Sequence, residues 1–226
     1  MQLEIYHGSA LKNVVPSMCH ESSDKEYGKG FYTTFSKEKA KQWAVVSNPV
    51  LHEGYVHKYT LETEGLKVLY AFKYCNLMET LALVANNKEY IRNMMSTKRM
   101  AKKVIDTFYK EEYAGYDVIV GHRFDARYMQ FIERILRGSL SVEVAKKHFA
   151  EMVSHDEELV VVLKTQKAFD RLKISTEAEA EYIDNPKYVD EYAKCWDEVL
   201  KQLQKLDLSE DNKAEDNLQH VLRKME

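Results

Sequence analysis

Cysteine, proline and glycine are scarce in this chain of 226 residues, which contains 3 Cys, 3 Pro and 8 Gly. The cysteines, Cys19, Cys75 and Cys195, are odd in number, lie far apart and form no C-x-x-C pair. They therefore argue against a disulfide framework and a zinc knuckle. Because 45% of the residues are hydrophobic and so few are Pro or Gly, the chain is neither disordered nor fibrous, and we expect a substantial buried core.

Long apolar runs are also missing. The run Leu159–Leu163 is among the longest, and it is far shorter than the roughly 18 residues that cross a bilayer. The opening residues MQLEIYHG lack the basic and apolar regions of a secretory signal. These absences predict a cytoplasmic protein with no membrane partner.

The familiar nucleotide and metal motifs are absent too. Gly28-Lys29-Gly30 is too short for G-x-G-x-x-G or for a P-loop. The strand histidines His52 and His57, and the helix-region histidines His148 and His155, have no partners at metal-ligand spacing. The sequence therefore predicts no Rossmann domain, no P-loop and no metal site.

Charge is distributed unevenly along the chain. Residues 175–226 carry 7 Lys and Arg against 14 Asp and Glu, whereas residues 1–174 have a net charge of +4. This predicts a domain at 1–174 and an acidic helical C-terminal extension at 175–226. A solvated helix explains the acidic extension most simply, and the mildly basic body leaves a nucleic-acid target open.

Hydrophobic periodicity predicts an α+β fold, since strands cluster early and late around a helical insert. Polar and apolar alternation or buried apolar runs predict strands at Gln2–His7, Gly30–Phe35, Gly54–Leu61, Leu66–Tyr70, Gly115–Gly121 and Leu159–Leu163. Helical spacing predicts helices at Lys37–Ala44 with Ser36 as N-cap, in two or three pieces across Met78–Tyr113, and at Ala126–Arg137, Val142–Val153, Gln166–Leu172 and Tyr188–Leu206.

Polar residues at the strand ends suggest a ligand site. His7 ends the first predicted strand directly before Gly8, where a missing Cβ would let a ligand approach the main chain. Tyr32, in the second strand, offers a ring for stacking a flat heteroaromatic group. Glu157 and Glu158 precede the apolar run at 159–163, where a carboxylate would stabilise developing positive charge.

These segments together resemble a known enzyme class. Tyr6-His7-Gly8-Ser9, Gly28-Lys29-Gly30-Phe31-Tyr32 and Glu158-Leu159-Val160-Val161-Val162 are similar to the three signature strands of the diphtheria-toxin and poly(ADP-ribose) polymerase class of ADP-ribosyltransferases, the His-Tyr-Glu group. The nearest likeness is to a bacterial family of uncharacterised domains with this fold. The resemblance covers roughly residues 3–174 and implies a split β-sandwich of two facing antiparallel sheets, surrounded by helices, with NAD in the cleft.

The resemblance also implies roles for individual residues. His7 would bind a ribose hydroxyl of NAD, the Gly8 backbone would hold the nicotinamide carboxamide, and Tyr32 would stack on the nicotinamide ring. Glu158 would orient the ribose and stabilise the oxocarbenium-like species. Ser9, the last residue of the same motif, would also contact NAD.

Three further positions belong to the same implied site. Trp43 lies near the place of a second stacking aromatic, with core packing as the equal alternative. Either Ser36 or Lys39 would supply the helix residue beside the nicotinamide. A gapless match from Lys164 backwards places Val160, rather than Glu158, where relatives carry a polar residue, so the catalytic position stays open between Glu158, Glu157 and none.

A second charged stretch, Gly121–Tyr128, resembles a motif of the same bacterial family. Its His122, Arg123 and Asp125 would face either the pocket or the target, although an ion-paired loop is the simpler interpretation.

The resemblance implies an NAD-dependent ADP-ribosyltransferase, a glycosyltransferase that modifies a macromolecular target, either protein or nucleic acid. Family analogy adds a bacterial toxin with an antitoxin partner, or a phage-defence effector. The first alternative is a catalytically silent module that binds NAD, ADP-ribose or a partner protein through the same cleft. A further alternative is a structural protein that assembles through its long C-terminal helix.

Overall fold

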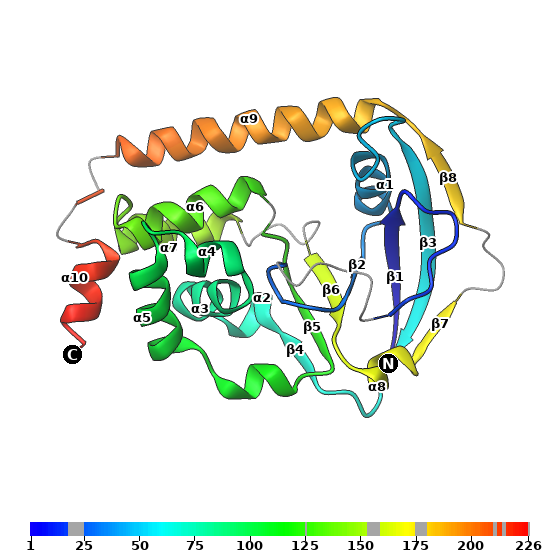
Figure 1. Cartoon of the computed structure of the whole chain (residues 1–226), viewed down its shortest axis with the longest axis horizontal. Coiled ribbons are helices and arrows are strands. Elements are labelled where there is room, and N and C mark those ends of the chain that lie inside the picture. The colour runs from blue at the N-terminus through cyan, green and yellow to red at the C-terminus, as the bar shows by residue number, and fades with distance from the viewer. Residues whose placement is uncertain are drawn as a thin grey trace.

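The computed structural model describes residues 1–17, 25–124, 126–152, 159–174, 180–209, 212–213 and 216–225. Its strands are β1 Gln2–Ser9, β2 Phe31–Thr34, β3 Glu53–Glu62, β4 Val68–Tyr70, β5 Val118–His122, β6 Leu159–Leu163, β7 Leu172–Ile174 and β8 Glu181–Asp184. Its helices are α1 Lys37–Val46, α2 Ala71–Tyr74, α3 Leu77–Asn87, α4 Glu89–Asn93, α5 Lys98–Phe108, α6 Ala126–Arg137, α7 Val142–Met152, α8 Gln166–Phe169, α9 Lys187–Asp207 and α10 Leu218–Arg223, with a 3-10 turn at Glu111–Gly115. The sheet occupies one end of the molecule and most helices the other (Figure 1).

The α+β class is confirmed. Hydrogen bonds join the described strands in one sheet of order β4-β5-β6-β2-β1-β3-β7, with β8 on β3, rather than in the two facing antiparallel sheets predicted. The β4–β5 pair is parallel, because helices α2 to α5 carry the chain from one strand back to the start of the other. β1 pairs along its whole length with β3, but it meets β2 through one residue pair, Tyr6 with Thr34. The sheet is therefore narrowly joined between β1 and β2.

The predicted apolar strand β6 is confirmed, and it is buried along its whole length. All five of its residues are at most 5% exposed. Val160 and Val162 pack in one cluster with Tyr32, whereas Val161 and Leu163 pack in another with Phe31. Since side chains alternate along a strand, β6 is covered on both faces and needs an unbroken apolar sequence.

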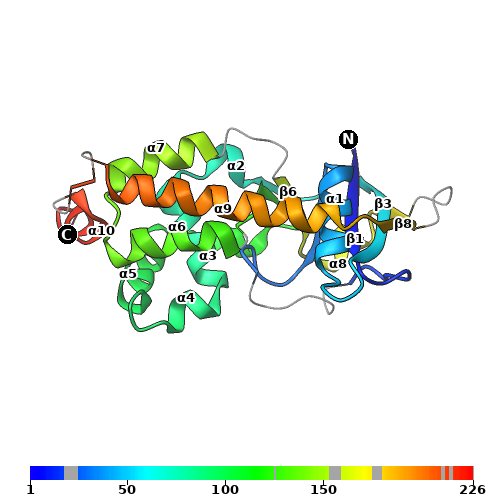
Figure 2. The ribbon, with the colours of Figure 1, turned by 90° about the horizontal axis from the view of Figure 1, so that it is seen from above.

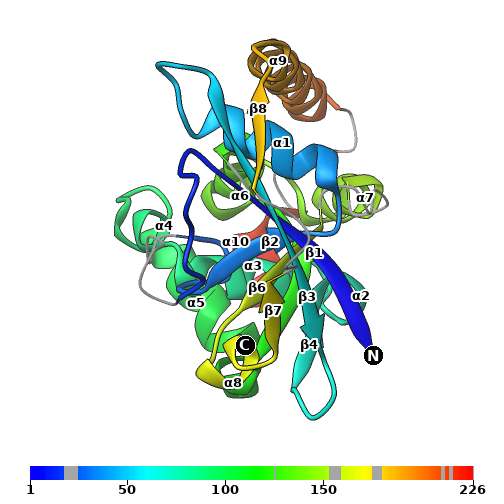
Figure 3. The same cartoon turned by 90° about the vertical axis from the view of Figure 1, so that its right-hand side faces the viewer.

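Helix α1 is fixed to the sheet by its cap and by its small residues. The Ser36 side chain accepts a hydrogen bond from the Lys39 N–H, which confirms the predicted N-cap. Ala40 and Ala44 are fully buried and let the helix lie close against β1 and β3 (Figure 3). Through Trp43, helix α1 forms part of the wall of the candidate site beside β1.

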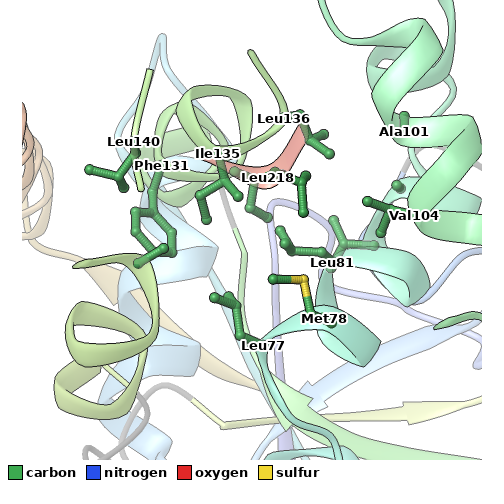
Figure 4. Close-up of a cluster of buried hydrophobic side chains, with 14 of the residues drawn as sticks. Leu77, Met78, Leu81, Ala101, Val104, Phe131, Ile135, Leu136, Leu140 and Leu218 are labelled. Carbon is green, nitrogen blue, oxygen red and sulfur yellow. The ribbon is translucent and has the colours of Figure 1, made fainter. Parts of the chain in front are cut away.

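A second core holds the helical end together (Figure 4). It is built mainly from α3, α5 and α6, and the chain after residue 174 also contributes to it through Val199 and Leu203 of α9 and Leu218 and Leu222 of α10. Helix α9 runs alongside both ends of the molecule, from α1 to α10 (Figures 1 and 2). The acidic C-terminal segment therefore shares a core with residues 1–174.

Several predicted boundaries are wrong. β1 continues through Gly8 to Ser9, because Gly8 and Ser9 still pair with β3. The helix predicted at Gln166–Leu172 ends at Phe169, since Leu172 begins β7 and pairs with Leu61. Strands β7 and β8 and helices α2 and α10 were not predicted at all.

Candidate functional site

A cavity of about 670 Å³ lies where β1 and β2 diverge. Five of the predicted site residues line it, and they come from β1, β2 and α1: His7, Gly8, Ser9, Tyr32 and Trp43. The structure thus brings together residues that are up to 36 positions apart in the sequence. They lie around the space beyond the one residue pair, Tyr6 with Thr34, that joins β1 to β2.

His7 uses its side chain to bridge the diverging strands. Its Nδ1 lies 2.8 Å from the Tyr32 carbonyl oxygen, and since a carbonyl only accepts, Nδ1 carries the proton. In the neutral ring, Nε2 is then a hydrogen-bond acceptor. The ring also packs on Phe31, with centroids 4.5 Å apart. Burial lowers the pKa of His7 to about 4, although the hydrogen bond to Tyr32 opposes that shift.

This lowered pKa predicts acid sensitivity. The unfolded chain binds a proton at His7 below its ordinary pKa of 6.5, whereas the folded chain binds it only near pH 4. Stability should therefore fall as pH drops from 6.5 to 4, on the order of 2–3 kcal/mol from this group. Urea unfolding across this range should show a smaller fall for His7→Gln, and His220→Gln, at an exposed position on α10, should match the wild type. Equal pH dependence in all three proteins would contradict the assignment.

Tyr32 holds its ring in the cavity wall through its hydroxyl group. The hydroxyl accepts a hydrogen bond from the Tyr27 N–H at 3.0 Å and donates one to the Gly28 carbonyl at 2.9 Å. The Lys25 Nζ lies 5.4 Å from the ring centroid. The side chain is only 6% exposed, so its orientation is determined by the turn at residues 25–28.

The sequence predicted that glycine at position 8 leaves room for a ligand, but the structure shows a different reason for it. A Cβ at this position would lie 1.9 Å from the Ala40 carbonyl oxygen and 2.8 Å from the Ala44 nitrogen. Helix α1, not a ligand, therefore occupies the space that the missing side chain leaves. Gly8 still lines the cavity, and the neighbouring Ser9 hydroxyl accepts a hydrogen bond from the Leu11 N–H.

Trp43 and Arg123 form a stacked pair at the cavity. The Arg123 guanidinium carbon lies 4.4 Å from the centroid of the Trp43 ring, and both residues line the cavity. Of the second charged stretch, His122 belongs to β5 and is buried, with its carbonyl accepting from the Tyr27 hydroxyl. Asp125 lies outside the described residues.

Other predicted residues do not join the site. Ser36 and Lys39 are absent from the described cavity lining, because Ser36 caps α1 instead. Glu157 and Glu158 lie outside the described residues. Val160, at the alternative position, does line the cavity.

The cavity also contains charged and aromatic side chains that the sequence did not reveal. Lys25, Glu26 and Lys88 approach from the loop before β2 and from the end of α3, and Tyr192 approaches from α9. Glu26 is 4% exposed, and its burial raises the pKa of the carboxyl group. The sequence carries one clue to the position of Glu26, which stands two residues before Gly28. In the structure, Gly28 has a φ of 76°, which marks a tight turn.

The described residues contain neither a metal-binding cluster nor a membrane-spanning helix. Within the described ranges, no three His, Cys, Asp or Glu side chains gather as a metal site would require. Among the same residues, no helix has the length and apolar character needed to cross a membrane.

Comparison with known proteins gives one finding. A family model described as "Protein of unknown function (DUF3990)" matches residues 3–174. Neither the curated proteins nor the solved structures contain a match to the chain. Since the family model covers well over half of the sequence, the chain belongs to the DUF3990 family.

Proposed function

We propose that this protein is an NAD-dependent ADP-ribosyltransferase that modifies a macromolecular target. One observation carries the proposal: His7, Tyr32 and Trp43, singled out from separate segments, line a common cavity. The narrow β1–β2 join supports the finer proposal of an ADP-ribosyltransferase-like split core, since it divides the sheet into two halves beside that cavity.

The cavity has the chemistry that a dinucleotide requires. Its volume of about 670 Å³ falls within the range of roughly 300–1,000 Å³ typical of ligand pockets. The rings of Tyr32 and Trp43 provide surfaces for flat heteroaromatic groups. Lys25, Lys88 and Arg123 provide positive charge for a diphosphate.

Each residue has a definable task in this proposal. His7, neutral above about pH 5 because of its low pKa, would accept a hydrogen bond from a ribose hydroxyl at Nε2. Tyr32 would hold the nicotinamide against a ring that cannot rotate away, because its hydroxyl is bonded on both sides. Glu158 would stabilise the positive charge that develops as the glycosidic bond of NAD breaks. The protein thus supplies positioning and charge.

Two parallel measurements on the purified full chain test this function. NAD should raise the melting temperature, since a ligand that binds only the folded state stabilises it. In the same preparation, NAD should yield free nicotinamide, measured by chromatography. If NAD neither shifts the melting temperature nor releases nicotinamide, the proposal is wrong.

The second candidate is a catalytically silent module that binds NAD or ADP-ribose. The observation in its favour is Val160, an apolar residue that lines the cavity from β6 at the position where relatives would carry a polar one. A silent module would show the thermal shift with NAD and with ADP-ribose but release no nicotinamide.

The acceptor, protein or nucleic acid, is open within the proposal. The net charge of +4 on residues 1–174 is compatible with a polyanionic target. A toxin paired with an antitoxin, or a phage-defence effector, is the biological role that we propose by family analogy. Incubating labelled NAD with separate protein and nucleic-acid fractions would show which class becomes labelled.

A further inference from the structure

Glu26 is the carboxylate that the described part of the chain places in the wall of the cavity. Its side chain is 4% exposed, which is unusual for a glutamate. Burying a carboxylate is costly unless other groups compensate for the lost water. A hydrogen bond from its own backbone N–H and the positive charges of Arg123, Lys88 and Lys25 partly compensate for its burial.

The turn that carries Glu26 is held from several directions. The Gly28 N–H closes it by donating to the Lys25 carbonyl, and the Tyr27 hydroxyl anchors it to the His122 carbonyl at 2.8 Å. The side-chain amide of Asn87 donates to the Glu26 carbonyl at 3.4 Å.

Two further side chains, those of Lys164 and Tyr32, complete the support of this turn. The Lys164 ammonium group donates to the Tyr27 carbonyl, and the Tyr32 hydroxyl bridges Tyr27 and Gly28. Gly121 makes room for the Tyr27 ring, because a Cβ there would lie 2.2 Å from the Tyr27 hydroxyl oxygen. The backbone under Glu26 is therefore rigid, as a residue that must act at a defined place requires.

Resting on the proposed function, we propose that Glu26 is a catalytic base that accepts the proton of the incoming acceptor. In this step the bond between the ribose C1′ and the nicotinamide nitrogen breaks, and nicotinamide leaves with the electron pair. The acceptor oxygen or nitrogen forms the new bond to C1′, and its proton passes to the Glu26 carboxylate and then to water. When water is the acceptor, the product is free ADP-ribose.

The environment of Glu26 suits this task better than a purely structural one. Burial raises the pKa of Glu26 above its ordinary 4.5, whereas Arg123, Lys88 and Lys25 keep it from rising further. A glutamate base works best when its pKa approaches the working pH. His7, in the same cavity, has a pKa of about 4, so its titration lies below that of Glu26.

The test measures nicotinamide release from NAD, with water as acceptor, between pH 4.5 and 8. In the wild type, kcat should fall as pH drops through the raised pKa of Glu26. Glu26→Gln should lose about 100-fold in kcat, with KM for NAD changed less than threefold, and should lack that pH-dependent limb. Glu26→Asp should retain part of the rate and the limb, and Glu143→Gln, at an exposed site on α7, should match the wild type.

A second readout needs no NAD. Because the folded pKa of Glu26 is raised, the folded state holds a proton that the unfolded state releases, so the contribution of Glu26 to stability should fall as pH rises above about 4.5, opposite in sign to the contribution of His7. Glu26→Gln removes this loss, so its melting temperature relative to the wild type should increase with pH.

The outcomes separate the two proposals. If the wild type releases nicotinamide and Glu26→Gln does so at the wild-type rate at every pH, the base assignment is overturned and the proposed function survives. If the wild type releases none, the transferase function itself fails, and the base assignment fails with it. A lower rate in Glu26→Gln that keeps the wild-type pH profile would also overturn the base assignment, because it would show a structural role.

Discussion

Replacing Glu158 with Gln is expected to lower nicotinamide release from NAD by about 100- to 1,000-fold. The amide has nearly the same shape as the carboxylate but no negative charge, so it cannot stabilise the positive charge that develops on the ribose. NAD binding should persist, since the aromatic and cationic groups of the cavity are unchanged. Radiolabelled NAD gives the rate, and the thermal shift with NAD shows that binding survives.

Glu157→Gln is the matched control for that variant. It makes the same chemical change one position away, and it should keep most of the wild-type rate. Loss of activity in Glu157→Gln alone would move the catalytic position by one residue. If both variants turn over NAD like the wild type, neither glutamate acts in the reaction, and Glu26, the carboxylate in the cavity wall among the described residues, is the next to examine.

The second large effect is on folding. Gly8→Ala is expected to destabilise the protein by about 3–5 kcal/mol. The added methyl group would lie 1.9 Å from the Ala40 carbonyl oxygen, and that atom belongs to helix backbone that no side-chain rotation can move. β1 and α1 would have to separate, and the cavity wall between them would change shape. Urea unfolding measures the loss directly.

Gly115→Ala provides the comparison for Gly8→Ala. A Cβ at Gly115 meets no heavy atom within 4 Å, so this substitution should change stability by less than about 0.5 kcal/mol. Similar small effects at both positions would show that α1 does not press on Gly8 as described. A large effect at Gly8 alone would show that this glycine is required for packing, whether or not a ligand also approaches it.

Local patterns were enough to predict the elements that have strong local causes. The alternation of Gly54–Leu61 and the apolar run Leu159–Leu163 predicted β3 and β6. Ser36 predicted the start of α1, and Gly138, with a φ of 75°, ends α6 where expected. Strand β8 and helix α10 were missed because they are short and are stabilised by partners far along the chain: β8 by β3, and α10 by the helical core.

The residues of the candidate site also fall into two groups, those that local motifs predicted and those that only the structure could place. His7, Gly8, Ser9 and Tyr32 were predicted because they belong to short motifs beside strands. Ser36 was misplaced because a serine before a helix can serve as a cap or as a ligand group, and only the structure distinguishes these uses.

By itself, the sequence determined the α+β class, most strands and helices, and the His7 and Tyr32 segments, because alternation, caps and turn residues act between near neighbours. Only the tertiary structure decided that β1 and β2 separate after one pair and that Glu26, Arg123 and Tyr192 reach the same cavity. These residues come from the turn before β2, from the position after the end of β5 and from helix α9. Their meeting depends on long-range pairing and packing, which no local pattern records.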